Sequence, residues 1–224
     1  MRVNETFYSL QGEGTLVGTP SVFIRLAGCP LHCRWCDTRY AWDFDAGKDL
    51  EPAQIVDRVS RWPCRFIVLT GGEPMVGPDL AARAGLADLT HRLHAMGKHI
   101  AIETSGILFI PDLACDLMSV SPKLSTQCLG LPESDVVETL RQLMRAYPYQ
   151  LKFVVESPED MDGIQSMLRE LGPTETERVM LMPQAATAEE LHARSAMVAE
   201  LCKQTGLRFG QRLHLQLWGP KRGV

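Results

Sequence analysis

Residues 21–37 read Ser21-Val22-Phe23-Ile24-Arg25-Leu26-Ala27-Gly28-Cys29-Pro30-Leu31-His32-Cys33-Arg34-Trp35-Cys36-Asp37. The apolar and β-branched residues at the start of this stretch predict a buried strand over Ser21–Leu26. Three cysteines follow in the next loop with the spacing Cys-x3-Cys-x2-Cys. Because the loops after parallel strands hold the active sites of β/α proteins, this stretch predicts both a strand and a site.

Further runs of the same kind recur along the chain and predict five more strands. These are Arg65–Thr70, His99–Thr104, Leu117–Ser121, Gln150–Val155 and Arg178–Met182. A continuous apolar run such as Phe66–Leu69 suits a strand buried on both faces, as in a parallel sheet. Segments with helical periodicity lie between the strands: Pro52–Arg61, Leu80–Met96, a helix between Pro132 and Pro148, Glu159–Leu171, and a helix capped by Thr187 and ended by Gly206.

Six β/α units with right-handed crossovers predict an α/β fold, either a doubly wound open sheet or an incomplete barrel. The chain has 224 residues, slightly fewer than the roughly 250 of a complete (β/α)8 barrel. We therefore favour a single domain over residues 1–224, an incomplete (β/α)6 TIM-like barrel. Leu213, Leu215 and Leu217 alternate within Leu207–Trp218, which predicts an added C-terminal strand.

Composition narrows the class of protein. The 23 Lys and Arg against 27 Asp and Glu give a formal charge of −4, so no global positive field favours nucleic acid or an anionic membrane. The N-terminus lacks the pattern of a secretory signal, and no stretch approaches the roughly 20 apolar residues of a membrane span. We expect a soluble, cytoplasmic protein with no nucleic-acid partner and no membrane association.

The seven cysteines fall into a cluster of three and four that are scattered singly, namely Cys64, Cys115, Cys128 and Cys202. Clustered thiols in a reducing compartment more often bind metal than form disulfides. Three ligands favour an iron–sulfur cluster, because a structural zinc site is closed by four ligands, whereas a cubane held by three cysteines keeps one iron open. Two alternatives remain: a Cys3His zinc site completed by His32, and a thioredoxin-like dithiol of Cys33 and Cys36.

A second motif follows the next predicted strand, Thr70-Gly71-Gly72-Glu73-Pro74. Paired glycines let a backbone approach a ligand closely, and a carboxylate complements an ammonium group. Together with Cys-x3-Cys-x2-Cys, this Gly-Gly-Glu sequence resembles the motifs of the radical S-adenosylmethionine (SAM) enzymes. The resemblance implies a [4Fe–4S] cluster and SAM as cofactors, and an incomplete barrel of the radical SAM type.

A narrower resemblance rests on a combination of short motifs: Leu10-Gln11-Gly12-Glu13-Gly14, Arg25, Cys36-Asp37-Thr38, Glu103-Thr104-Ser105-Gly106 and Ser121-Pro122-Lys123. Their combination, from Phe7 to the end of the chain, is similar to the 7-carboxy-7-deazaguanine synthase family. That resemblance implies a carbon–nitrogen lyase that converts 6-carboxy-5,6,7,8-tetrahydropterin to 7-carboxy-7-deazaguanine with loss of ammonia, in the biosynthesis of queuosine and other 7-deazapurines. It also implies Mg²⁺, a homodimer, and an electron donor such as flavodoxin or ferredoxin.

The same resemblance assigns roles residue by residue. Cys29, Cys33 and Cys36 would hold the cluster, and Thr38 would bind Mg²⁺ through its hydroxyl. Substrate contacts would come from Leu10, Gln11, Gly12, Glu13, Arg25, Thr70, Glu103 and His214, with Glu13, Arg25, Glu103 and His214 at the catalytic centre. SAM would lie against Gly72, Glu73, Ser121, Pro122, Lys123, Met182, Pro183 and Gln184. The Val224 carboxylate could approach the substrate, and the role of the long Met75–Leu89 segment stays open.

Other interpretations of these residues remain. A glycyl-radical activating enzyme would share the cysteines and Gly-Gly-Glu, but would not need the other motifs. A non-enzymatic zinc-binding module would need only the cysteine loop. Arg25 requires a partner because a charge in a buried strand cannot stay unpaired, and the alternative to a substrate carboxylate is a carboxylate of the protein.

Overall fold

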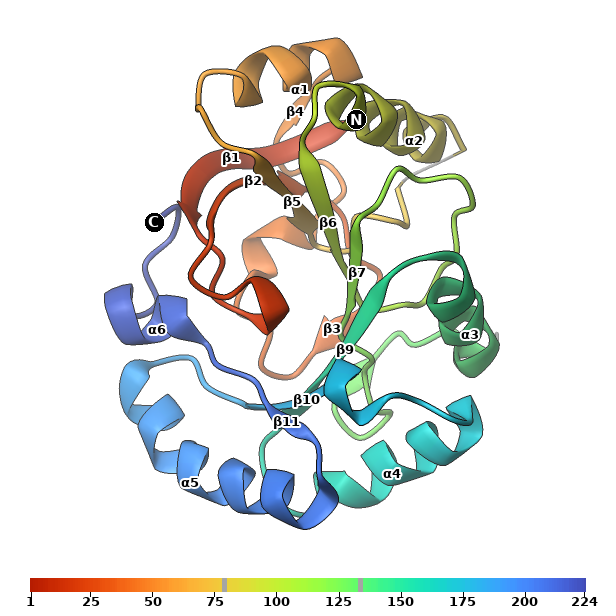
Figure 1. Ribbon diagram of the computed structural model, residues 1–224. Helices are drawn as coiled ribbons and strands as arrows, with labels where there is room; N and C mark the ends of the chain where they lie inside the picture. Colours follow the sequence, from red (N-terminus) through yellow and green to blue (C-terminus); the bar gives the residue numbers. More distant parts are fainter. Residues whose placement is uncertain (78–79, 133–134) are drawn as a thin grey trace.

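The structure is a computed structural model that describes residues 1–77, 80–132 and 135–224 (Figure 1). All six strands expected from the sequence are present and lie parallel, each beside the next. They are β2 (Pro20–Leu26), β5 (Phe66–Gly71), β6 (His99–Thr104), β7 (Leu117–Val120), β9 (Tyr149–Val155) and β10 (Val179–Pro183). Each of these runs is rich in β-branched or apolar residues, and most of their side chains are buried.

The sheet is open rather than closed. Three further strands extend it: β1 (Arg2–Leu10), β4 (Lys48–Asp49) and β11 (Arg208–Phe209). The strand order is β11-β10-β9-β7-β6-β5-β2-β1-β4, so that β11 and β4 form two unjoined edges. Figure 1 shows the crossover helices around the outside of the curved sheet. These are α1 (Pro52–Val59), α2 (Leu80–Ala95), α3 (Val136–Ala146), α4 (Asp160–Leu171) and α5 (Ala188–Thr205). The incomplete barrel predicted from the sequence is confirmed.

Alternation along the strands gives the sheet two different faces. Ile24, Leu69 and Ile102 belong to the large apolar core. Their neighbours Phe23, Val68 and Ala101 form a small separate cluster on the opposite face. Because strand side chains alternate with a period of two, the next residues on that inner face are polar and lie nearer the carboxyl ends of the strands. They are Arg25, Thr70 and Glu103.

Register places these polar side chains in one row across the inner face. Arg25 on β2 pairs with Thr70 on β5. Glu103 on β6 pairs with Ser119 on β7, and Ser119 pairs in turn with Gln150 on β9. The strands that form the core therefore also bring the candidate site residues together.

The N-terminal strand β1 (Arg2–Leu10) was not expected. It runs antiparallel to β2 and also pairs with β4 (Lys48–Asp49). Val3 is its one buried residue; the others are half-buried or exposed. Without an apolar face, the run carries no clear strand pattern.

The expected C-terminal strand over Leu207–Trp218 is wrong for most of its length. A two-residue strand, β11 (Arg208–Phe209), pairs with β10. The short helix α6 (Leu213–Trp218) then follows. The alternating leucines do not share a buried face, because Leu215 is 4% exposed while Leu217 is 51% exposed.

Four residues, in two segments about which the sequence makes predictions, are not described by the structure. Pro78 and Asp79, within Met75–Leu89, lie outside the described residues, as do Glu133 and Ser134 ahead of α3. Among the residues that are described, no helix combines the length and apolar character needed to cross a membrane.

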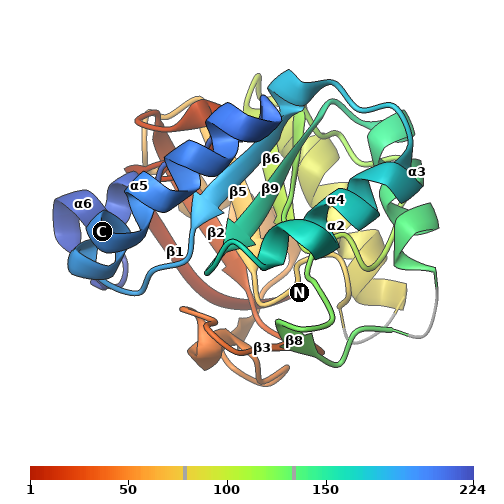
Figure 2. The same cartoon turned by 90° about the horizontal axis from the view of Figure 1, so that it is seen from below.

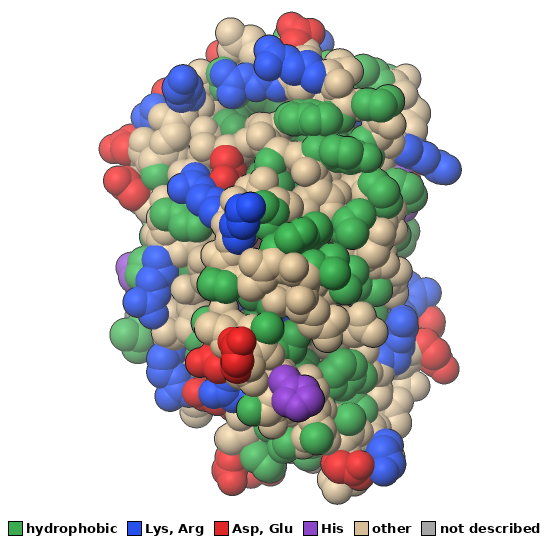
Figure 3. All heavy atoms as spheres, turned by 90° about the vertical axis from the view of Figure 1, so that its left-hand side faces the viewer, with side chains coloured by type: hydrophobic (Ala, Val, Ile, Leu, Met, Phe, Trp, Pro, Cys, Tyr) green, Lys and Arg blue, Asp and Glu red, His purple; other side chains and the backbone are tan. Residues whose placement is uncertain are grey.

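On the face that carries α6 and the C-terminus, Lys and Arg side chains are interspersed with Asp and Glu (Figure 3).

Candidate active site

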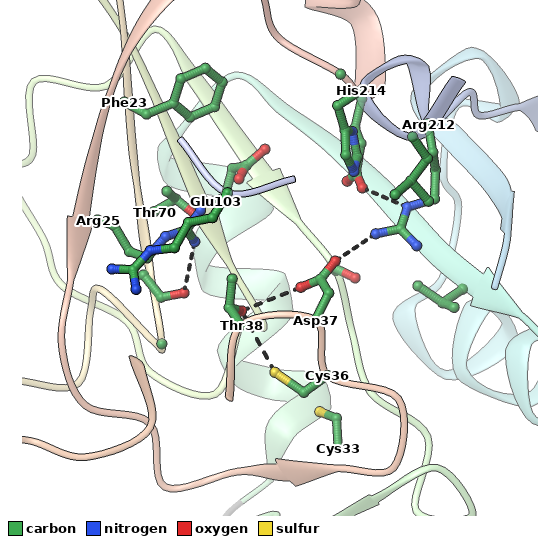
Figure 4. A pocket seen from close by; sticks show the side chains of 18 of the residues that line it. Phe23, Arg25, Cys33, Cys36, Asp37, Thr38, Thr70, Glu103, Arg212 and His214 are labelled. Carbon is green, nitrogen blue, oxygen red and sulfur yellow. Dashed lines mark hydrogen bonds and ion pairs between the residues drawn. The ribbon is translucent and has the colours of Figure 1, made fainter. Parts of the chain in front are cut away.

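A cavity of about 370 Å³ lies on the inner face of the sheet, at the carboxyl ends of the parallel strands. All the site residues expected from the sequence line it except Pro122, Pro183 and Gln184. Figure 4 shows cysteines of the loop on one side of this space, with Arg25, Thr70 and Glu103 on another. The three exceptions adjoin lining residues in the chain and are not themselves part of the wall.

The cysteine loop is fixed by backbone hydrogen bonds to the next turn of the chain. Gly28 N–H donates to Ala41 O at 2.8 Å, and Cys29 N–H donates to Trp42 O at 3.0 Å. The Trp42 indole N–H also donates to Cys36 Sγ at 3.2 Å. Burial raises the pKa of the Cys29 thiol to about 12, so metal binding there must displace a proton.

Thr38 lies beside this loop and faces the cavity. Its hydroxyl is 3.6 Å from Cys36 Sγ and donates to Asp37 Oδ1 at 3.3 Å. Figure 4 shows both contacts. A hydroxyl next to an exposed carboxylate provides the oxygen donors that hard cations prefer.

The Gly-Gly-Glu motif packs against the cysteine loop. A Cβ at Gly72 would lie 2.4 Å from Gly28 O and 2.8 Å from Ala41 O, so only glycine fits this close approach. Glu73 is 2% exposed. One carboxylate oxygen accepts from Thr104 Oγ1 at 2.6 Å, and the other accepts from Ser105 N at 2.7 Å. The Glu103–Gly106 motif therefore locks the Glu73 carboxylate in place.

The Leu10–Gly14 motif crosses the cavity to reach β6. Gln11 Nε2 donates to Glu103 Oε1 at 3.2 Å, and Gln11 Oε1 accepts from Glu13 N at 3.0 Å. Gly12 packs directly on the imidazole of His214, which lies on α6 rather than on a strand: a Cβ at Gly12 would lie 2.1 Å from His214 Nδ1. Burial lowers the pKa of His214, although Glu13 opposes the effect. The imidazole is therefore neutral at pH 7.

Two basic side chains that sequence reasoning missed hold the acidic groups. Lys152 on β9 is 3% exposed, and its Nζ lies 2.9 Å from Glu13 Oε2 and 3.4 Å from Glu103 Oε1. Arg212 lies 3.1 Å from Glu13 Oε1 and 2.7 Å from Asp37 Oδ2. We call Glu13, Glu103, Asp37, Lys152 and Arg212 the charge network. A charge within the predicted strand Gln150–Val155 was a signal that could have identified Lys152, whereas no motif marks Arg212.

Arg25 has a protein partner. Its Nε lies 2.8 Å from Glu5 Oε1, and its Nη1 donates to Gly71 O at 3.4 Å. Arg222, near the C-terminus, pairs with the other Glu5 oxygen at 2.8 Å. The carboxylate alternative considered for Arg25 is thus present, and the guanidinium still faces the cavity.

Lys123, which follows β7, and Met182 on β10 complete the wall. Lys123 Nζ donates to Ser121 Oγ at 2.9 Å. Gly223 and Val224 also line the cavity. The site therefore combines a thiol-rich end with an end rich in charged and polar groups.

Glu13 gives a first testable consequence. Burial raises the pKa of this carboxyl group, but Lys152 and Arg212 outweigh that effect and hold the pKa below 4.5. Ionised Glu13 therefore stabilises the folded chain above pH 4.5, and this contribution is lost as the pH falls toward the lowered pKa. We expect Glu13→Gln to be less stable than the wild type near neutral pH, with a difference that shrinks at acidic pH.

Urea unfolding across the acidic range measures this difference. The control is Glu177→Gln, because Glu177 is exposed and its replacement should leave stability nearly unchanged at every pH. A stability difference for Glu13→Gln that stays constant with pH would contradict the ionised carboxylate.

The chain matches a known class of proteins. The model of the radical SAM superfamily matches residues 23–150, which include the cysteine loop and the Gly-Gly-Glu motif. The partial barrel and its cysteine loop thus define a radical SAM protein.

Relatives identify the family within that class. The chain is 40% identical to the 7-carboxy-7-deazaguanine synthase of Halobacterium salinarum, over 96% of this chain and 90% of the relative. It is 36% identical to that of Pyrobaculum aerophilum, over 100% of this chain and 97% of the relative. The crystal structure of QueE from Escherichia coli matches with a TM-score of 0.73 at 25% identity, over 95% and 94% of the two chains. The chain belongs to the radical SAM enzymes and, among them, to the family of the 7-carboxy-7-deazaguanine synthases.

Membership of the superfamily implies a [4Fe–4S] cluster and SAM, and the donor set fits them. Cys29, Cys33 and Cys36 are free thiols that face one cavity. In the part of the chain that is described, no three His, Cys, Asp or Glu side chains are close enough to hold a single metal ion. A cluster does not need that convergence, because each cysteine binds a different iron. His32 is exposed and, unlike the three cysteines, does not line the cavity, which argues against the Cys3His zinc site.

Proposed function

We propose that this chain converts 6-carboxy-5,6,7,8-tetrahydropterin to 7-carboxy-7-deazaguanine with loss of ammonia. The observation that carries the proposal is one cavity with two chemically different ends. Free thiols lie at one end, and an arginine with several carboxylates lies at the other. A small polar substrate with both an anionic group and an N–H-rich edge fits the second end.

At the cofactor end, Cys29, Cys33 and Cys36 would hold the cluster, and the cluster with SAM would supply a carbon-centred radical. Glu73 and Gly72, with Ser121, Lys123 and Met182, would form the wall against SAM. Pro122, Pro183 and Gln184 would act only through the backbone that positions their lining neighbours. We further propose that Thr38 binds Mg²⁺ through its hydroxyl.

At the substrate end, Arg25 would bind the pterin carboxylate, since a guanidinium forms charge-assisted hydrogen bonds with that group. Glu103 and Gln11 would accept and donate hydrogen bonds along the N–H edge of the pterin, together with the backbone of Leu10 and Gly12. Thr70 adjoins Arg25 and would contact the same end of the ligand. His214, neutral at pH 7, would hydrogen-bond the substrate without adding charge.

The charge network would keep these groups in the required ionisation state. Both Glu13 oxygens already contact Lys152 or Arg212, so Glu13 would stay ionised and would not donate a proton. Glu103 uses Oε1 for Gln11 and Lys152, which leaves Oε2 to accept from the substrate. Within the charge network, Glu13 would therefore hold neighbouring side chains in place, whereas Glu103 would bind the substrate.

Ligand binding tests the proposal. We expect the wild type to bind the carboxylated pterin more tightly than the same tetrahydropterin without its carboxylate. Arg25→Gln should weaken binding of the carboxylated ligand by roughly 10- to 150-fold, as expected for a lost hydrogen bond to a charged group of about 1.5–3 kcal/mol. Binding of the decarboxylated ligand should be the same in both proteins.

Calorimetric titration under anaerobic conditions provides the dissociation constants. Arg92→Gln is the matched control, since Arg92 pairs with Asp88 on the exposed side of α2, and it should bind like the wild type. Equal weakening of both ligands by Arg25→Gln would show that Arg25 acts through the fold alone.

A substitution at Gly12 tests the contact with His214. The Cβ of Gly12→Ala would overlap the His214 ring, and that side chain can move while the backbone stays in place. We expect KM for the pterin to rise roughly 2- to 10-fold, the effect of one lost hydrogen bond. His214→Ala should give a similar rise, and the double variant should add little. Fully additive effects in steady-state kinetics would contradict the coupling.

The alternative of a glycyl-radical activating enzyme would require a protein substrate. The polar residues Gln11, Arg25 and Glu103 around this cavity favour a small molecule instead. A flavodoxin or ferredoxin as electron donor, a homodimer and a cytoplasmic location stay predictions from the family.

A further inference from the structure

Two short strands bring a fourth thiol to the cysteine loop. Strand β3 (His32–Cys33) pairs antiparallel with β8 (Cys128–Leu129), apart from the main sheet (Figure 2). Cys33 lies directly opposite Cys128, and the two Sγ atoms are 3.2 Å apart. Among the described cysteines, this is the one pair of thiols in hydrogen-bond contact. Cys128, which looked isolated in the sequence, is therefore a neighbour of a cluster ligand.

The backbone geometry of this pair suits a disulfide. Arg34 N–H donates to Gln127 O at 3.1 Å, so the adjoining Cys33–Cys128 pair is of the non-hydrogen-bonded kind. Opposed residues of that kind have Cα atoms about 4.5 Å apart. Disulfides span Cα separations of about 4.4–6.8 Å. A bond between the two sulfurs therefore needs only a small side-chain adjustment.

The two thiols differ in access. Cys33 is half-buried and lines the cavity, whereas Cys128 is 6% exposed and is not part of the cavity wall. A small oxidant that enters the cavity would meet Cys33 first, and Cys128 would be in place to react with the product. This arrangement is that of an oxidisable cysteine with a resolving partner.

We propose that, in protein without its cluster, Cys33 and Cys128 form a reversible disulfide that protects Cys33 from irreversible oxidation. The Cys33 thiol attacks hydrogen peroxide, the O–O bond breaks, and a sulfenic acid and one water form. Cys128 then attacks that sulfur, the S–O bond breaks, and the hydroxide leaves as a second water with the Cys128 proton. Two electrons pass from the two sulfurs to the peroxide.

Cys33 would therefore have two alternative states, bound to iron or bonded to Cys128. Bound to iron, Cys33 is not available to Cys128. Once the cluster is lost, the disulfide would hold Cys33 in a form that a thiol reductant restores, and cluster assembly would wait for that reduction. Without Cys128, Cys33 would proceed to sulfinic and sulfonic acid.

Peptide mapping of the full-length, metal-free protein tests the proposal. After limited peroxide treatment, alkylation and non-reducing trypsin digestion, we expect the peptide 26–34 linked to the peptide 124–141. Peptide 26–34 also contains Cys29. The linked peptide should therefore form in Cys29→Ser as well, with its mass changed only by the substitution, and this result assigns the bond to Cys33. A bond from Cys33 to Cys29 or Cys36, or fully alkylated Cys128 in the treated wild type, would overturn the proposal.

Recovery of iron binding provides the second readout. After peroxide treatment followed by dithiothreitol, the wild type should reconstitute its iron and sulfide content. Cys128→Ser should recover several-fold less and should contain Cys33 as sulfinic or sulfonic acid. Cys202→Ser is the control and should behave as the wild type. Neither readout involves the pterin, so a negative result for the disulfide is distinguishable from failure of the proposed reaction. Peptide mapping of the wild type tests the disulfide even if Cys128→Ser folds poorly.

Discussion

Replacing Cys29 with alanine is expected to reduce reconstituted iron and sulfide sharply and to bring turnover below detection. Cys29 is one of three thiols that face the cavity, and two remaining cysteines cannot hold a site-differentiated cubane with one open iron. Burial keeps this thiol protonated in metal-free protein, so its contribution as a ligand depends on iron binding. Metal analysis and anaerobic kinetics on the same preparation measure both effects.

Controls separate this effect from a general loss of thiols. Cys202→Ala removes a buried cysteine of α5 that belongs to the apolar core and does not line the cavity, and it should retain iron and turnover. Cys33→Ala and Cys36→Ala should match Cys29→Ala. Full iron content and turnover in Cys29→Ala would mean that the cluster is held by other residues.

Lys152→Met is expected to cause the second large loss. The ammonium lies between the carboxylates of Glu13 and Glu103, both within 3.4 Å, and these carboxylates raise the pKa of Lys152 against the opposing effect of burial. Methionine fills a similar space without charge, which leaves two carboxylates facing each other without their shared cation. Breaking a buried ion pair from one side costs about 3–5 kcal/mol, and displacement of binding groups should lower kcat/KM roughly 100-fold.

Chemical denaturation and steady-state kinetics would measure the two losses. Lys152→Arg keeps the charge and should recover part of both. The double variant Lys152→Met with Glu13→Gln should be more stable than the sum of the single effects, because it also removes one of the two carboxylates that lost the lysine. Unchanged stability and kinetics in Lys152→Met would show that the network does not position the carboxylates.

The parts of the fold that could be predicted are those with a local pattern. The six parallel strands have continuous apolar sequence, and α5 has clear ends: Thr187 Oγ1 accepts from Glu190 N at 3.3 Å, and Gly206 takes a φ of 74°. Strand β1 has no such pattern: it pairs with β2 along most of its length, but Val3 is its one buried residue. For α6, alternating leucines suggested a strand, although only Leu215 is buried.

The same distinction applies to the site. The cysteine loop and the Gly-Gly-Glu motif are contiguous and follow strands, so their meeting at one sheet edge could be predicted. Arg212 reaches Glu13 across 199 residues from an irregular segment, and nothing in the local sequence indicates that contact. Cys128 meets Cys33 only because two strands of two residues pair across 95 positions.

Anaerobic turnover tests the central claim most directly. The reconstituted, reduced protein is incubated with SAM, Mg²⁺ and 6-carboxy-5,6,7,8-tetrahydropterin, beside a relative of established activity as positive control, and the products are identified by mass spectrometry. The proposed function predicts 7-carboxy-7-deazaguanine and ammonia in equal amounts from the wild type. Absence of the deazaguanine product while the control reaction succeeds would contradict it.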